Sequence, residues 1–168
     1  MAHFDDQYDD ELDNFEEDED TQKEKYITFL LGDEEYAIEI QYVIEIIGMQ
    51  KFTHLPEAAS YIKGVIKLRD SVYPVIDMRK RFRLPEAEYT DRTCIIIVKI
   101  GDNSIGLIAD SVNEVLNIPA DNISASGTNS LSTKSQFLQG IGKLGERVVI
   151  ILDINKVISE EEIESIAI

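Results

Sequence analysis

Disulfides and membrane spans find little support in the composition of the chain. The 168 residues include one cysteine and no tryptophan. Cys94 alone cannot form an internal disulfide, which fits a reducing compartment. No segment approaches the roughly 18 uninterrupted apolar residues that a membrane span needs, and the N-terminus lacks the apolar core of a secretory signal. The sequence therefore predicts a cytoplasmic protein without direct membrane insertion.

The scarcity of histidine limits the chemistry. The two histidines are His3, in the acidic start of the chain, and His54, before a Leu-Pro loop signal. Without a second cysteine, a zinc site or a nucleophile–base pair is hard to assemble. Asp77 and Asp153 each follow a strand-like apolar run, where a short carboxylate most often caps the next turn. We predict no catalytic residue, no metal and no cofactor.

One motif resembles a dinucleotide-binding loop. Gly140–Gly145 (GIGKLG) satisfies G-x-G-x-x-G, but such a loop must be followed by a helix. The residues that follow, Arg147–Ile154 (RVVIILDI), form a strand pattern instead. Nucleotide binding is therefore not expected.

Negative charge is concentrated at the N-terminus. The formal net charge is -17, and residues 1–24 contain 12 Asp and Glu against one lysine. Such a segment repels itself and has little apolar surface to bury, so we predict a disordered acidic tail over 1–24. Docking to a basic partner is the alternative for this tail. The scarcity of cations excludes nucleic acid and an anionic membrane surface as partners.

Positive charge is gathered in one short region. Seven of the 16 Lys and Arg residues lie within 63–83. A solvated face is the ordinary explanation, and a docking surface for an acidic partner is the alternative. Within this region Arg69 lies at the tip of a predicted hairpin, where its guanidinium suits carboxylates or carbonyls of a partner. The seven residues are Lys63, Lys67, Arg69, Arg79, Lys80, Arg81 and Arg83.

From residue 25 onward the chain has the pattern of short strands. Lys25–Leu31 and Glu35–Ile40 flank a Gly-Asp turn, and Thr93–Ile100 and Ser104–Ala109 flank another. This arrangement predicts two β-hairpins. Residues 95–98 (IIIV) are consecutive and apolar, so both faces of that strand are expected to be covered, as in a layer between two halves.

The sequence also contains an internal duplication. A shift of 69 positions places Val43 and Glu45 on Val112 and Glu114, and a shift of 76 aligns six identical residues between 64–80 and 140–156. Each copy is too small for a robust core of its own. We predict two β-barrel subdomains, roughly 25–90 and 91–158, in one body. A capping box of Ser and Glu at 159 and 162 predicts a short C-terminal helix from about residue 160.

The residue strings of this body resemble a known family. YITFLLGDEEYAIEIQYVIEIIG, YIKGVIKLRDSVYPVIDMRKRF and FLQGIGKLGERVVIILDINKVI are similar to the CheW coupling proteins of bacterial chemotaxis, over about Tyr26 to Ser159. The resemblance implies an all-β CheW-like domain at 25–168, with two intertwined five-stranded SH3-like barrels. It implies a non-enzymatic adaptor between chemoreceptors and the histidine kinase CheA. The partners would be the CheA regulatory domain and the cytoplasmic receptor tip, at receptor arrays of the inner membrane, with the free protein monomeric.

The resemblance also implies site residues. Val43 and Gly64 are the kinase-binding candidates, and Glu45 and Arg69 are the receptor-binding candidates. The family usually has Asn-Leu-Arg-Gly around the arginine, whereas this chain has Lys-Leu-Arg-Asp. Because aspartate tolerates left-handed backbone geometry less well than glycine, Asp70 could alter the turn and the position of Arg69. Two alternatives are a β-barrel regulatory protein that senses a small molecule, and a regulatory module of the CheV or CheA type with another partner.

Overall fold

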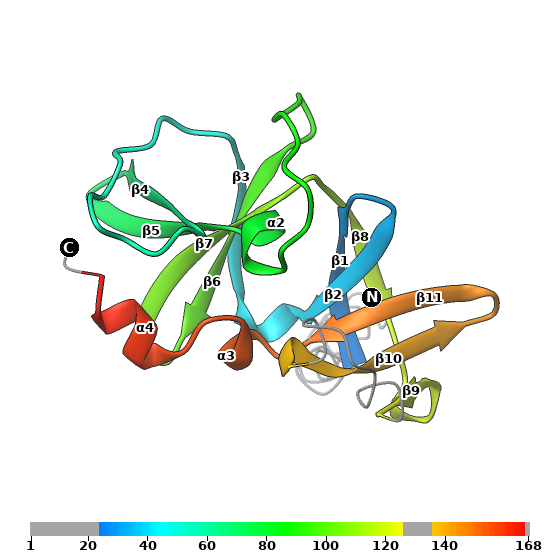
Figure 1. The fold of residues 1–168 in the computed structure, drawn as a ribbon. Helices are drawn as coiled ribbons and strands as arrows, with labels where there is room; N and C mark the ends of the chain where they lie inside the picture. Colours follow the sequence, from blue (N-terminus) through cyan, green and yellow to red (C-terminus); the bar gives the residue numbers. More distant parts are fainter. Residues whose placement is uncertain (1–23, 126–135, 167–168) are drawn as a thin grey trace, which may run out of the picture.

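Eleven strands in two sheets dominate the computed structural model, which describes residues 24–125 and 136–166. The predicted acidic tail thus lies outside the described residues, apart from Glu24. Sheet A has the order β8 (Ser111–Asn117), β1 (Lys25–Leu31), β2 (Glu34–Glu39), β11 (Arg147–Leu152), β10 (Leu138–Leu144) and β9 (Ile123–Ser124). Sheet B has the order β3 (Val43–Gly48), β6 (Cys94–Ile100), β7 (Asn103–Ala109), β5 (Ser71–Asp77) and β4 (Ile62–Leu68). In Figure 1 sheet B lies on the left and sheet A on the right.

The two sheets exchange strands between the halves of the chain. Sheet A combines β1 and β2 of the first half with β8, β10 and β11 of the second, and sheet B combines β6 and β7 with β3, β4 and β5. Each sheet joins the halves of the chain by one antiparallel and one parallel pairing, which are β1–β8 and β2–β11 in sheet A and β3–β6 and β5–β7 in sheet B. The prediction of an all-β fold with two intertwined SH3-like barrels is confirmed. The boundary near residue 90 separates the sequence repeats, while both sheets draw strands from each side of it.

Strand β6 lies between two hydrophobic cores. Ile95 and Ile97 point into a cluster that belongs to sheet B, whereas Ile96 and Val98 point into the larger cluster shared with Phe29 of β1. All four β6 side chains are fully buried. A strand with apolar contacts on both faces needs apolar residues at consecutive positions. The continuous apolar run therefore forms a layer, as predicted, and this layer lies between the core of sheet B and the core that the two sheets share.

The short helices begin at the predicted caps. Asp77 accepts from the backbone N of Arg79 at 3.0 Å and starts α2 (Met78–Arg81). Asp153 caps α3 (Ile154–Val157) in the same way. Ser159 starts α4 (Glu160–Glu164) with the expected capping box, which confirms the C-terminal helix. Two three-residue 3₁₀ helices complete the described elements, η2 (Ile40–Tyr42) and η3 (Ala120–Asn122).

An ion pair connects the two sheets beside α2. The Arg79 guanidinium donates to both Asp110 carboxylate oxygens, at 2.8 Å from Nε and 2.5 Å from Nη2. Asp110 lies between β7 of sheet B and β8 of sheet A, and it also accepts from the backbone N of Gly32 at 2.8 Å. The third Arg79 contact is the carbonyl of Pro85 at 2.7 Å. The pair thereby fixes the passage of the chain from one sheet to the other.

The motif at 140–145 belongs to the hairpin of β10 and β11. A strand rather than a helix follows it, as the sequence predicted. Among the described residues no helix combines the length and the apolar character needed to span a membrane.

Candidate partner-docking surface

Strand β3 is an edge strand with an apolar outer face. It pairs with β6 and has no neighbour on its other side in the strand order of sheet B. Ile44 is 50% exposed and Ile46 is 40% exposed. An edge strand offers unpaired backbone groups, and exposed apolar side chains beside them favour contact with another protein.

Glu45 of this strand binds Arg69 of the β4–β5 turn. Two hydrogen bonds join the side chains, from Nη1 to Oε1 at 2.9 Å and from Nη2 to Oε2 at 3.1 Å. The hydrogen bonds from Arg69 hold the pKa of Glu45 below its usual value. The Arg69 side chain is 72% exposed, and an exposed ion pair of this kind adds little to stability. The structure thus brings both receptor-binding candidates together on the surface.

In the β4–β5 turn the residue with left-handed backbone geometry is the arginine. Leu68 pairs with Ser71, so Arg69 and Asp70 form a two-residue connection. Arg69 has a φ of 58°, whereas Asp70 is not among the described residues with positive φ. The left-handed conformation therefore falls on the residue before the position where the family usually has glycine. Asp70 therefore replaces the usual glycine without backbone strain.

The two kinase-binding candidates lie in different surroundings. Val43 is half-buried at the start of β3 and packs against the large core cluster, next to a register shift in the β3–β6 pairing. Gly64 is buried on β4 with a φ of 149°. A Cβ placed there would lie 2.4 Å from the carbonyl oxygen of Thr53. Gly64 therefore lets the segment after β3 pack against β4 and forms no part of the exposed face.

A groove between the two sheets continues the β3 surface. Its volume is about 420 Å³, and it lies between strands β3 and β6 of sheet B and strands β1 and β8 of sheet A. Burial raises the pKa of the Cys94 thiol in its wall. No sequence pattern identified this groove, because each of its two walls combines strands from both halves of the chain. It is lined by Leu30, Ile46, Arg92, Cys94, Ser111, Val112 and Asn113.

Sheet A carries a related ion-pair arrangement on its own edge strand. Glu114 of β8, the repeat equivalent of Glu45, accepts from Nη2 of Arg147 at 3.2 Å. Arg147 also donates to Glu35 of β2, at 2.8 Å from Nε and 2.5 Å from Nη2. Hydrogen bonds from Arg147 lower the pKa of Glu35 to about 2. The sequence analysis did not identify this network, although the alignment of Glu45 with Glu114 points to it.

The Glu35 network predicts a pH-dependent contribution to stability. The pKa of Glu35 is about 2 in the folded protein and about 4.3 in an unfolded chain. The contribution is therefore complete above about pH 5 and is lost as the pH falls toward 2. We expect Glu35→Gln to melt below the wild type at pH 7, with a difference that shrinks as the pH falls from about 5 to 2. Thermal melts of both proteins across this range measure it.

Glu146→Gln provides the matched control, because Glu146 is an exposed carboxylate in the adjacent hairpin turn. It reports the effect of losing one negative charge without the contacts to Arg147. A melting difference for Glu35→Gln that stays constant from pH 7 to pH 2 would contradict the assignment.

The basic run at 63–83 is largely neutralised inside the protein. Four of its seven cations make ion pairs with carboxylates of the described residues. The ammonium of Lys63 lies over the rings of Phe52 and Tyr89, at 5.9 and 5.1 Å from their centroids. Pairing within the protein, rather than the solvated face that is the ordinary explanation, thus accounts for most of the run. The paired residues are Arg69, Arg79, Lys80 and Arg81, with Glu45, Asp110, Glu86 and Glu162 as partners.

The chain is similar to known chemotaxis proteins along most of its length. A family model described as the CheW-like domain matches residues 25–162. The chemotaxis protein CheW of Bacillus subtilis is 39% identical over 142 residues, which cover 84% of this chain and 91% of that protein. The CheW of Klebsiella aerogenes is 35% identical over 143 residues, which cover 85% of this chain and 86% of that protein. The crystal structure of the scaffolding protein TtCheW from Thermoanaerobacter tengcongensis matches with a TM-score of 0.72 and 33% identity, over 78% of this chain and 84% of that one.

Proposed function

Because the chain belongs to the family of CheW-like domains and is therefore a chemotaxis adaptor, we propose that it couples the regulatory domain of the histidine kinase CheA to the cytoplasmic tip of chemoreceptors. The proposed adaptor works by binding alone, in the cytoplasm, at receptor arrays of the inner membrane. The observation that carries the proposal is the edge strand β3, which exposes isoleucines on one face and holds the Glu45–Arg69 pair on the other.

The receptor tip is proposed to bind along the free edge of β3, from which the charged pair on one face and the apolar groove on the other can both be reached. The Glu45–Arg69 pair presents a planar guanidinium and a carboxylate with fixed orientation, which suits polar groups on a partner. The groove beside Ile46 offers apolar walls to an amphipathic helix, which is one common way in which grooves bind helical partners. Together these features favour a helical receptor segment that inserts apolar residues and is oriented by the ion pair.

The kinase is proposed to depend on Val43 and Gly64 in different ways. Val43 is half-buried, so its outer surface can add apolar contact while its inner surface packs on the core. Gly64 acts through the segment at Thr53, whose position it permits. We therefore expect Val43 to contribute contacts, and Gly64 to shape the surface that the kinase meets.

Reversing the charge of Arg69 separates binding from stability. Arg69→Glu is expected to weaken receptor binding by about tenfold or more, because the exposed pair is replaced by two like charges at the proposed contact. The melting temperature should change by no more than about 2 °C, since exposed ion pairs contribute roughly 0–1 kcal/mol. Titration against a receptor-tip fragment and a thermal melt measure the two effects.

The charge-swapped double variant Glu45→Arg/Arg69→Glu is the control for this experiment. It restores an ion pair with the opposite direction, so a recovery of stability without a recovery of binding assigns the contact to the individual side chains. A large loss of melting temperature in Arg69→Glu alone would instead assign Arg69 a structural role.

The proposal as a whole is tested by direct binding. Folded protein is titrated with a CheA regulatory domain and, separately, with a receptor-tip fragment. Binding to both, with formation of a three-component complex, supports the coupling function. Failure to bind either one, with the protein shown to be folded, would overturn it.

A further inference from the structure

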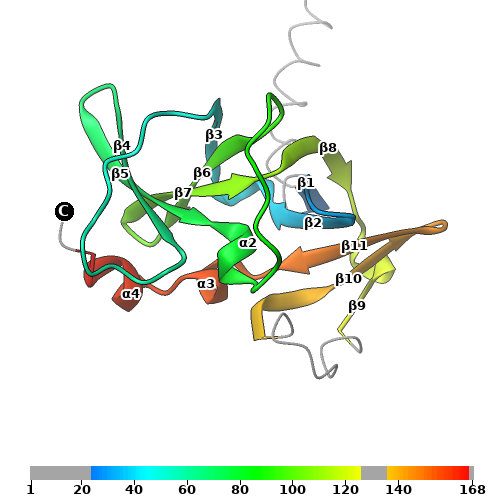
Figure 2. The same cartoon turned by 45° about the horizontal axis from the view of Figure 1, so that its top comes forward.

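The C-terminal helix α4 is held on sheet B by one carboxylate and two isoleucines. Glu162 accepts from the hydroxyl of Tyr61 at 2.5 Å and from Nη2 of Arg81 at 3.1 Å. Ile163 and Ile166 are 6% and 8% exposed. Figure 1 shows α4 against the β4–β5 side of the molecule, close to the marked C-terminus. Figure 2 shows the same placement after rotation.

The surroundings of Arg81 hold its guanidinium in a position that favours a negative charge beneath α4. Its guanidinium carbon lies 4.2 Å from the centroid of the Tyr61 ring and 5.1 Å from that of Phe137. Nε donates to the carbonyl of Val157 at 2.7 Å, which fixes the direction of the fork. The side chain is only 16% exposed. A cation held between two rings and turned toward one carboxylate selects an acidic group at that point.

Electrostatics at Glu162 keep this carboxylate charged. Burial opposes its ionisation, but hydrogen bonds from Tyr61 and Ser159 and the charge of Arg81 together lower its pKa. At neutral pH the carboxylate is therefore available as the fixed acceptor of both donors.

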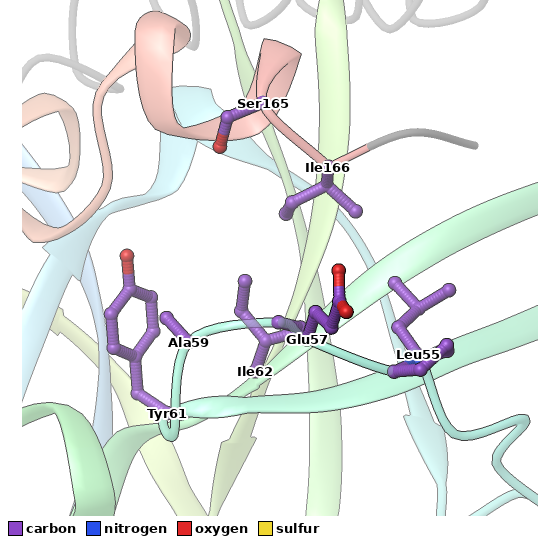
Figure 3. A pocket seen from close by; sticks show the side chains of 9 residues that line it. Leu55, Glu57, Ala59, Tyr61, Ile62, Ser165 and Ile166 are labelled. Carbon is purple, nitrogen blue, oxygen red and sulfur yellow. The ribbon is translucent and has the colours of Figure 1, made fainter.

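The surface under α4 is wider than the helix that covers it. A hollow of about 430 Å³ lies on one side, between the helix end and the loop before β4. Figure 3 shows Ile166 and Ser165 facing Tyr61, Ile62 and Glu57 across this space. A second hollow of about 480 Å³ lies on the other side, against the start of β5 and the β6–β7 turn. Ile166, two residues beyond the end of α4, lines both hollows and lies between them.

The helix is also short for its task. Five residues form α4, whereas isolated helices below roughly 12 residues are marginal in water. A longer helix with the same contacts would gain its own hydrogen bonds and could extend into the adjoining hollows. The seat of α4, formed by Tyr61, Arg81 and the walls of the two hollows, therefore has room for a helix that continues beyond the end of α4.

We propose that this seat is a docking groove for an acidic amphipathic helix of a partner protein, and that α4 occupies it as an internal competitor. The partner helix carries a carboxylate followed by apolar side chains one and four positions later, as in Glu162, Ile163 and Ile166. Its carboxylate replaces that of Glu162 on Arg81 and Tyr61, and its apolar side chains replace the two isoleucines. The groove is separate from the β3 surface, so this inference does not depend on the proposed function.

An internal competitor lowers the apparent affinity of the groove. The apparent dissociation constant equals the intrinsic one divided by the fraction of molecules in which α4 has left. Weakening the hold of α4 without changing the seat should therefore tighten binding in trans. Glu162→Gln does this, because it removes the charge that Arg81 receives and leaves Arg81, Tyr61 and the apolar seat unchanged.

The probe is a fluorescein-labelled synthetic peptide of residues 157–166, extended by about two alanine- and glutamine-rich helical turns. Its anisotropy is titrated with the wild-type chain and with Glu162→Gln. We expect the variant to bind at least about tenfold more tightly than the wild type. Adding Arg81→Gln to the variant should remove this gain. A peptide in which glutamine replaces the glutamate at the position of Glu162 should also lose it. Glu161→Gln, an exposed position on the same helix, should bind as the wild type does.

Hydrogen exchange on the wild type gives a test that needs no variant. The amides of Ile163 and Ile166 bond to the carbonyls of Ser159 and Ile163, so excess peptide should speed their exchange as α4 is displaced. Equal binding by wild type and Glu162→Gln would place the peptide elsewhere and overturn the proposal. The proposal is equally overturned if α4 exchange in the wild type is unchanged by saturating peptide, or if Glu162→Gln frees α4 without binding the peptide.

Discussion

Replacing Gly64 with alanine is expected to lower the melting temperature by roughly 10 °C. Two effects add at this position. A side chain at a φ of 149° is strained, which costs about 1–3 kcal/mol, and its Cβ would lie 2.4 Å from the carbonyl oxygen of Thr53. The backbone at Thr53 must then move, although its amide donates to the carbonyl of Val65 at 2.8 Å and its carbonyl accepts from the amide of Val65 at 2.9 Å. Thermal and denaturant unfolding measure the loss.

Gly48→Ala is the control for this variant. Gly48 ends β3, and a Cβ there would meet no atom within 4 Å, so its melting temperature should stay within about 2 °C of the wild type. If Gly64→Ala weakens kinase binding and stability together, the glycine acts through the shape of the barrel. A normal melting temperature with lost kinase binding would contradict this and make Gly64 a direct contact.

Replacing Arg79 with glutamine is the second large expected loss, at about 2 kcal/mol or roughly 6 °C. The estimate lies between the near-zero value of exposed pairs and the 3–5 kcal/mol of buried ones, since Arg79 is 17% and Asp110 33% exposed. Loss of the guanidinium removes both of its hydrogen bonds to Asp110, which keeps the one from Gly32, and the bond to the carbonyl of Pro85. Unfolding curves of the variant and the wild type at pH 7 give the difference.

A double-mutant cycle with Asp110→Asn checks that the loss comes from the pair. The double variant should lose less stability than the sum of the two single losses, by about 1 kcal/mol or more, because each single change removes the same contact. The hydrogen bonds from Arg79 lower the pKa of Asp110, so the effect of Arg79→Gln should diminish in acid, as Asp110 becomes protonated. Additive single effects would show that Arg79 stabilises the protein without Asp110.

Local features of the fold could be predicted because they depend on neighbours in the sequence. The hairpin strands, the capping aspartates and the capping box of α4 each follow from a few adjacent residues. The burial of 95–98 followed from four consecutive apolar positions. The exchange of strands could not be derived in this way. Equivalent strands in a duplicated chain have similar patterns, so pairing within a half and pairing between halves satisfy the same periodicity.

Only part of the candidate site could be predicted from the sequence, for the same reason. Arg69 was placed at a hairpin tip from local turn signals, and the structure confirms its exposure. Its partner Glu45 lies 24 positions away, and Arg81 meets a carboxylate 81 positions away. Ion pairs at such separations depend on the fold and have no local signature, so the basic run appeared as a patch. The groove at Ile46 has walls from both halves and was invisible to any local pattern.

The exchange of strands also restricts how this module can be inherited. A recombination event in the stretch between α2 and β6 would give each product half of sheet A and half of sheet B. A new second half must then complete two old half-sheets at once, through the β1–β8, β2–β11, β3–β6 and β5–β7 pairings. Neither barrel can be duplicated, deleted or transplanted singly, so in evolution and in protein engineering the module moves as a whole.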